Sequence, residues 1–452
     1  MRKIKKYCSD RSNGKDSDEL MSQNHNLYKQ PLPGVKPAHP EQLRKPLWVE
    51  KYRPMLMFCL SLLVSGMSIA DDNAQALTLH YFGTAGLSYV TSGQADFVRD
   101  LSQPNGAKGG QWSYQLDSLA GAQANFQIND QLEIVAQAVS RHRYDDTYLP
   151  ELTWAFAKYS PRPDVDLRGG RLGTDFYMRA DSRLVGYSYL TVRPSVDYYG
   201  ALPFQYFDGL DGAVTVPLGE GLLRAKAFGG YSPEKVPFGS AQWDLSDSPM
   251  LGGNLGYQWG SWQFRLSYAQ IRYTHDLPLG FATLVSTLRG IPLPGTQAAA
   301  NAIAVQGSTS RHYSAGVVYE EGPLQVQLMV SGAKNQSATF QDGVAGYLLT
   351  GYRVGAVTPY AGLSWNRNNA ASLSGTGVAA LDAALKDAIG ESHSDQHTYT
   401  LGLRWDFRSG MDVKVQWDAI RGSPGSKFMY RWEQPGWTGQ THVLSAVVDF
   451  AF

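Results

Sequence analysis

The last twelve residues, Thr441-His-Val-Leu-Ser-Ala-Val-Val-Asp-Phe-Ala-Phe452, alternate between two sets of side chains. Positions 442, 444, 446, 448, 450 and 452 hold histidine, leucine, alanine, valine and two phenylalanines. Successive side chains of a β-strand point to opposite faces, so a period of two indicates a strand with one mainly apolar face. We expect this apolar face to point outward.

The same alternation recurs along the chain. Between Tyr399 and Phe407, tyrosine, leucine, leucine, tryptophan and phenylalanine share one face, and threonine, glycine, arginine and aspartate share the other. Alternation alone also fits a water-soluble sandwich. Sixteen such strands are expected, at 76–90, 113–128, 131–142, 151–159, 165–172, 208–217, 222–231, 250–259, 262–273, 311–320, 324–335, 342–353, 357–366, 397–408, 411–419 and 441–452.

The connections between these strands separate the two architectures. Every second connection is a tight turn, such as Asn129-Asp130, Gly260-Ser261 and Ser409-Gly410, whereas most of the others are long, up to 37 residues at 274–310. Short turns on one rim and long loops on the other are typical of transmembrane β-barrels. The sequence therefore predicts an all-β, antiparallel transmembrane barrel of 16 strands over residues 71–452, with short periplasmic turns and long extracellular loops.

The N-terminal part has a different composition. Residues 1–50 are polar and rich in lysine and proline, and we expect them to be disordered or to be an extension of the gene model. Residues 51–70 have the pattern of a secretory signal peptide, with Lys51 and Arg53 before an apolar run that ends at Ser68-Ile-Ala70. A retained anchor is the alternative, but the run is short of the roughly 20 residues that span a bilayer.

The overall composition argues against several kinds of site. Of the 452 residues, 40 are lysine or arginine and 40 are aspartate or glutamate, so no excess of positive charge indicates nucleic-acid binding. Cys8 and Cys59 are the two cysteines, and both precede residue 71. We therefore expect no disulfide framework, no cysteine metal site and no cofactor in the barrel.

Two local motifs carry a resemblance to a known family. The C-terminal strand with its terminal aromatic resembles the last strand of Gram-negative outer-membrane barrels, and this resemblance implies that Phe452, with Phe450, is the signal read by the barrel-assembly machinery. Leu167-Arg-Gly-Gly-Arg-Leu172 is similar to the Gly-Arg step that ends the fifth strand of trimeric general porins. By this resemblance the chain is a homotrimer in the cell outer membrane, in contact with lipid and lipopolysaccharide, and segment 173–207 is a constriction loop folded into the lumen. The acidic signature that the family carries in this loop is not evident here.

Barrels of 16 strands enclose an aqueous channel, so the expected function is passive diffusion of ions and small hydrophilic solutes. Charges placed across a narrow gap would give the pore a transverse field. The expected constriction charges are Arg171, Asp175, Arg179, Asp181, Arg183, Arg193 and Asp197. The charges expected on the lumen wall include Arg141, Arg168, Arg224, Lys226, Arg265, Arg404, Lys414, Glu133 and Asp166. The arginines of the loop give a modest preference for anions.

Alternatives remain open at this stage. A substrate-selective channel for phosphate, another anion or a sugar would use an arginine ladder or an aromatic slide, and the tyrosines and phenylalanines of 176–207 could form one. An outer-membrane enzyme or an adhesin is less favoured, because the only crude catalytic candidates are His142 with Asp145 and Asp146, and His275 with Asp276. His393 and His397 follow a short helix that we expect at 378–389 within a long loop. They are four residues apart but have no evident third ligand, so we expect no metal site.

Overall fold

The computed structural model describes residues 77–278, 280–369, 371–427 and 430–452. The expected N-terminal extension at 1–50 and signal peptide at 51–70 lie outside the described residues. None of the helices that are described is long and apolar enough to span a bilayer.

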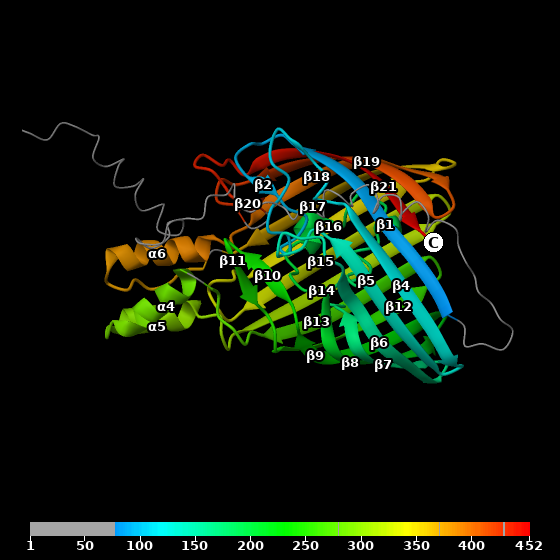
Figure 1. The fold of residues 1–452 in the computed structure, drawn as a ribbon, viewed down its shortest axis with the longest axis horizontal. Helices are drawn as coiled ribbons and strands as arrows, with labels where there is room; N and C mark the ends of the chain where they lie inside the picture. The colour runs from blue at the N-terminus through cyan, green and yellow to red at the C-terminus, as the bar shows by residue number, and fades with distance from the viewer. Residues whose placement is uncertain (1–76, 279, 370, 428–429) are drawn as a thin grey trace, which may run out of the picture. The chain divides into compact units, whose positions relative to one another are not determined.

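Sixteen strands form one closed antiparallel barrel, in which β1 pairs with β21 on one side and with β4 on the other (Figure 1). The predicted fold class is confirmed. The barrel strands are β1 (Leu77–Val90), β4 (Leu119–Asn129), β5 (Leu132–Arg141), β6 (Glu151–Arg162), β7 (Val165–Gly173), β8 (Tyr206–Leu218), β9 (Gly221–Ser232), β12 (Ser248–Trp259), β13 (Trp262–Arg272), β14 (Thr309–Glu321), β15 (Leu324–Asn335), β16 (Gly343–Tyr352), β17 (Val357–Asn368), β18 (Asp395–Arg408), β19 (Met411–Gly422) and β21 (Gln440–Ala451).

The barrel is apolar on its outer face and polar within. Leu210 and Leu266 point outward and are 68% and 61% exposed, whereas Lys414 and Asp449, on alternate positions of their strands, are fully buried. This is the reverse of a water-soluble sheet, because the outer face is solvated by lipid. Closure also leaves none of these sixteen barrel strands with an unpaired edge, as a lipid environment requires.

Phe450 and Phe452 lie on the outer face of the closing strand, with ring centroids 6.1 Å apart. Backbone hydrogen bonds join Phe452 to Tyr81, so the end of the chain is fixed against β1. The role of these two phenylalanines in assembly stays a prediction.

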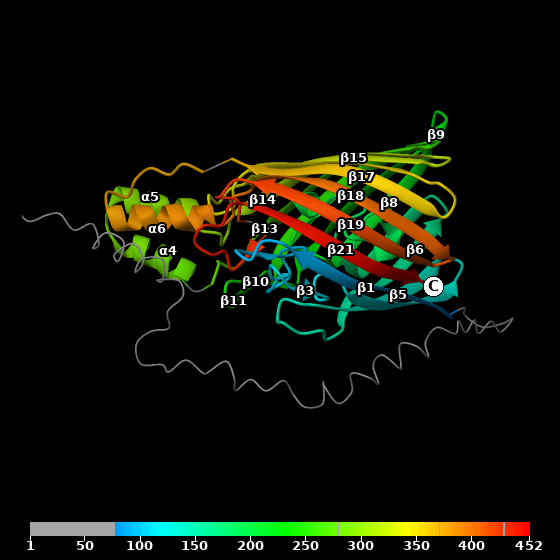
Figure 2. The same ribbon diagram turned by 90° about the horizontal axis from the view of Figure 1, so that it is seen from above.

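The long connections contain structure that the sequence did not predict, apart from one helix. The expected helix near 378–389 is α6 (Ala379–Gly390). Helices α4 (Gly280–Gly290) and α5 (Pro294–Ile303) lie beside it, beyond the end of the barrel that carries the long loops (Figure 2). The remaining elements are β2 (Asp96–Phe97), β3 (Trp112–Ser113), η2 (Gly186–Ser188), α3 (Val196–Tyr199), β10 (Lys235–Phe238), β11 (Ala241–Asp244) and β20 (Tyr430–Arg431).

One predicted strand start is wrong. The strand expected to begin at residue 113 begins at Leu119, because Trp112–Ser113 pairs separately with β1 and a turn closed by Ser118 N–H and Tyr114 C=O follows.

Candidate functional site

Residues 174–205, called here the inner segment, connect β7 to β8. Gly173 and Tyr206 are register partners, so the chain leaves the wall and returns to it at one point. Most side chains of the inner segment are buried, and they contact inward-facing residues of the wall rather than solvent. The segment therefore lies inside the barrel.

The first part of the inner segment is held by basic residues of β9 and β13. Asp175 pairs with Lys226 Nζ at 2.9 Å and also with Arg265. Burial alone would raise the pKa of Asp175, but the two cations outweigh burial and lower it. Farther along, Arg179 pairs with Glu320 of β14 at 2.9 Å.

The middle of the segment contacts the opposite wall. The short helix η2 packs against β1 and β21, and Lys414 Nζ of β19 donates to the carbonyl of Gly186 at 2.8 Å. Arg404 of β18 donates to the carbonyls of Tyr187 and Tyr189, each at 3.0 Å. Since β13 and β1 are eight strands apart in a ring of sixteen, the segment crosses the full width of the lumen.

Arg193 makes the most enclosed of these contacts. Its guanidinium donates to both carboxylate oxygens of Asp117 at 2.7 Å and to Asp418 at 3.2 Å. The Arg193 and Asp117 side chains are each only 2% exposed. Such a paired arginine anchors the segment and is not free to meet a solute.

The helix α3, in the last part of the inner segment, is held against β17 and β18 by hydrogen bonds. The Asp197 carboxylate accepts hydrogen bonds from Ser364 and Gln396, both at 2.6 Å, and Asn366 donates to the Asp197 carbonyl at 2.8 Å. Burial raises the pKa of Asp197, and these hydrogen bonds oppose the rise.

The aromatic residues of the inner segment form a core instead of a slide. Phe176 packs against Phe204 and Phe228, and Tyr198 packs against Tyr347, with ring centroids 5.4–5.9 Å apart. The same hydrophobic cluster continues through the residues of β10, β11, α4, α5 and α6 that are buried. The long loops therefore pack onto the segment from one side of the barrel.

The expected ring of constriction charges is corrected in two respects. Arg171 shares its strand face with the outward-pointing Leu167 and pairs with Asp208 at 2.7 Å, so it lies on the outer wall. Arg183 donates to the backbone carbonyls of Leu202 and Phe204 within the segment itself. Of the seven expected charges, those that line the large cavity described next are Asp175, Arg179 and Asp181.

A cavity of about 720 Å³ lies between the inner segment and the wall on the side of the short turns. The wall charges expected at 133, 166, 168, 224, 226 and 265 line it, together with Lys158. Arg404 lines a neighbouring cavity of about 280 Å³, which also reaches Arg179. The two other expected wall charges do not line either cavity, since Lys414 is buried against η2 and Arg141 pairs with Glu151 at 3.4 Å.

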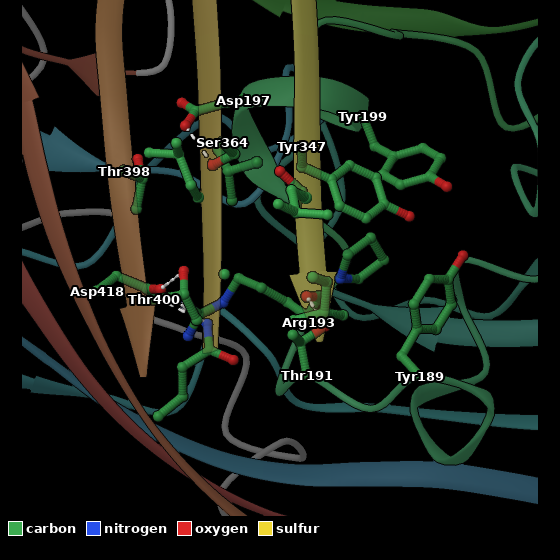
Figure 3. Close-up of a pocket in the computed structure, with 18 of the residues that line it drawn as sticks. Tyr189, Thr191, Arg193, Asp197, Tyr199, Tyr347, Ser364, Thr398, Thr400 and Asp418 are labelled. Carbon is green, nitrogen blue, oxygen red and sulfur yellow. Dashed lines mark hydrogen bonds and ion pairs between the residues drawn. The ribbon is translucent and has the colours of Figure 1, made fainter. Parts of the chain in front are cut away.

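A narrow slot of about 50 Å³ separates the inner segment from β16–β19. Figure 3 shows Thr398, Thr400 and Ser364 on the strands facing α3 and the chain before it. Leu190 and Gln327 line both the slot and the 280 Å³ cavity, so the two spaces adjoin. The slot has the smallest volume of these three spaces.

Glu234, just before β10, is a functional candidate that the sequence did not reveal. Its carboxylate accepts backbone N–H groups of Gln205 and Tyr206 at 2.7 and 3.2 Å, so it fixes the end of the inner segment. Burial and the nearby Glu151 raise the pKa of Glu234 to about 8.

This raised pKa predicts a pH dependence. The fold favours the protonated form of Glu234, so its contribution to stability is complete below pH 4.5 and is lost as the pH rises through 8. We expect the free energy of unfolding in detergent micelles to fall between about pH 5 and about pH 9, and E234Q to flatten this fall. The exposed Glu391, substituted in E391Q, provides the control. An unchanged slope in E234Q would contradict the assignment.

The histidines considered for catalysis or metal binding do not converge. His393 bonds Gln341 at 2.9 Å, whereas His397 lies on the outer face of β18 against Tyr399. His142 contacts Asp146 at 2.7 Å in a loop. Within the described ranges, no three histidine, cysteine or acidic side chains are grouped so as to hold a metal ion.

Comparisons by sequence give no relatives, since no family model and no curated protein matches the chain. Solved structures match it by fold. OmpF of Salmonella typhi, in complex with daunomycin, is 12% identical, with a TM-score of 0.53 over 85% of this chain and 99% of its own. The outer-membrane channel DcaP of Acinetobacter baumannii is 9% identical, with a TM-score of 0.51 over 86% and 100%. OmpT of Vibrio cholerae, in a trimer form, is 13% identical, with a TM-score of 0.50 over 83% and 100%. The chain therefore has the closed, 16-stranded barrel fold of outer-membrane porins and channels.

Proposed function

We propose that the protein is an outer-membrane channel for passive diffusion of small hydrophilic solutes, without enzymatic activity. The observation that carries this proposal is the inner segment, which is anchored on opposite walls and leaves hydrophilic space beside it. The 720 Å³ cavity adjoins the 280 Å³ cavity at Arg179 and Ser182, and the 280 Å³ cavity adjoins the slot beside β16–β19. The narrow slot favours a selective channel over a wide general pore.

The charges of the large cavity favour anions. Its lining includes six basic side chains and four acidic ones, and each of the basic side chains is in an ion pair, with Asp166, Asp175, Asp211 or Glu320 as the acidic partner. Arg224 is 48% exposed and Lys158 is 35% exposed, so both remain accessible to a solute. Cations lining a confined space raise the local concentration of anions.

A homotrimer is the assembly we propose. The outer faces of β4, β5 and β6 carry alanines that are register neighbours, such as Ala124, Ala136 and Ala155. Leucines and aromatic residues cover the outer faces of β12–β18 instead, as lipid contact favours. Small side chains allow two barrel walls to approach closely, and the trimeric form of a structural neighbour supports this arrangement.

Single-channel recording in planar bilayers tests the proposal. We expect the full chain, purified from outer membranes, to give small current steps in groups of three, with a reversal potential that indicates anion preference under a salt gradient. The variant K158Q/R224Q should shift the reversal potential toward cations, because it removes exposed positive charge from the cavity.

R162Q is the matched control, because Arg162 is a still more exposed cation, paired with Asp164 at a tight turn outside the cavity. A folded protein that passes no current would contradict the channel. An unchanged reversal potential in K158Q/R224Q would contradict the role of the cavity in selectivity.

A further inference from the structure

Three basic residues gather on the outer face of the barrel, where β13, β14 and β15 approach the long loops. Arg272, Arg311 and Lys334 are all exposed, and Arg311 lies directly opposite Lys334 in the register of β14 and β15. Arg272 is opposite Thr309, two residues from Arg311. Like charges on directly opposite positions of neighbouring strands repel each other, so this arrangement is unfavourable without an anion.

The three cations lie at the level expected for lipid headgroups. Just below them on the same faces, Tyr268 and Tyr313 are cross-strand neighbours with ring centroids 5.3 Å apart. Aromatic girdles of this kind mark the membrane–water interface of a barrel. The exposed Leu266 and Leu328 follow farther down, where acyl chains would surround the wall.

Acidic partners are scarce at this place. Lys334, whose side chain is 65% exposed, pairs with Asp342 at 2.9 Å. Within residues 77–452, apart from the few that the structure leaves undescribed, Arg272 and Arg311 have no ion pair. Two other outward cations near the same end of the barrel are neutralised, since Arg367 pairs with Asp395 and Arg171 with Asp208, whereas Arg421 donates to the Gln440 side chain. The three residues, called here the basic cluster, therefore carry two uncompensated positive charges.

A glycine lies on the outer face beside the basic cluster. Gly332 of β15 is flanked in the register by Tyr313 and Val344, whose side chains are exposed. A Cβ atom at Gly332 would contact only the Gly343 carbonyl, at 3.8 Å, so the space above this glycine is open. This open space offers room for an alkyl chain between the exposed side chains of Tyr313 and Val344.

We propose that the basic cluster binds a phosphate group of an anionic glycolipid of the outer leaflet, with an acyl chain of that lipid over Gly332. Arginine forks form charge-assisted hydrogen bonds with phosphate oxygens, and lysine adds a point charge. One phosphate held between Arg311 and Lys334 relieves their mutual repulsion. This inference rests on the outer-membrane location in the proposed function, and it adds a lipid site that passage through the channel does not require.

Binding of diphosphoryl lipid A to the purified full chain in neutral detergent micelles tests the inference, with native mass spectrometry as the readout. The variant R272Q/R311Q/K334Q should raise the dissociation constant for lipid A by roughly tenfold or more, since each lost charge-assisted hydrogen bond weakens binding. R367Q/R421Q removes two cations from the outer face near the same end and should leave binding within about twofold. Lipid A without phosphates should bind the wild type no better than it binds the triple variant.

Wild-type affinity in the triple variant would overturn the proposal, and so would an equal loss in R367Q/R421Q, because net charge alone would then explain binding. Circular dichroism of each variant establishes that the barrel is folded. Channel currents of the triple variant should match those of the wild type. Failure of lipid binding in a protein that conducts is thus distinguishable from failure of the proposed channel function.

Discussion

Replacing Arg193 with methionine is expected to lower the free energy of unfolding by about 3–5 kcal/mol, because two buried carboxylates lose their partner. Arg193 lies between Asp117 and Asp418 with its side chain 2% exposed, and it also donates to Ser445. Methionine fills a similar volume but cannot compensate either charge. The same change frees the middle of the inner segment, so we also expect larger and noisier single-channel currents.

Urea unfolding of the variant in lipid vesicles, followed by tryptophan fluorescence, measures this loss. R162Q, which removes an exposed arginine from a tight turn, should change stability by less than about 1 kcal/mol. The variant R193M/D117N/D418N removes the whole charged cluster and should recover much of the stability, since no lone buried charge remains. A stability of R193M equal to that of R162Q would show that the cluster does not anchor the segment.

The barrel could be predicted from the sequence because its signals are local. Alternation in a stretch such as Trp262 to Tyr268 reports a lipid-facing and a lumen-facing side within a few residues. Tight turns such as Gly260-Ser261 then set the pairing of neighbouring strands. The long loops lack such signals, because their packing depends on partners distant in the sequence. Only the alanine- and leucine-rich helix α6 has a pattern that is visible by itself.

The site could be predicted only in outline, for the same reason. The resemblance predicts that the inner segment lies in the lumen. It also predicts that the charged side chains of the segment face water, whereas several of them are buried in ion pairs. Arg193 and Asp418 are 225 residues apart, and no local pattern indicates that they meet. The outer position of Arg171 is the one that strand parity predicts, since Arg171 lies an even number of residues from the outward Leu167 on the same strand. Glu234 was missed because its partners are backbone N–H groups, which any sequence supplies.

Removing the inner segment is expected to raise the single-channel conductance severalfold. Because Gly173 and Tyr206 are register partners, an Asn-Gly turn in place of residues 174–205 joins β7 and β8 as a tight hairpin. The deletion opens the lumen where the segment now contacts β9, β13, β18 and β19. It also exposes the aromatic core around Phe176, so a loss of thermal stability accompanies the gain in current. Unchanged conductance in the folded deletion variant would place the constriction elsewhere.

A single substitution makes the same test with less disturbance of the core. A Cβ atom at Gly186 would clash with Asp449 Oδ1 and Thr84 Oγ1, so G186A should push η2 away from β1 and β21. We expect a conductance between those of the wild type and the deletion variant. G229A is the matched control, since a Cβ atom at Gly229 meets only the Met250 carbonyl at 3.8 Å. If both alanine variants conduct like the wild type while the deletion variant conducts more, the segment narrows the lumen without depending on the fit of η2 against the wall.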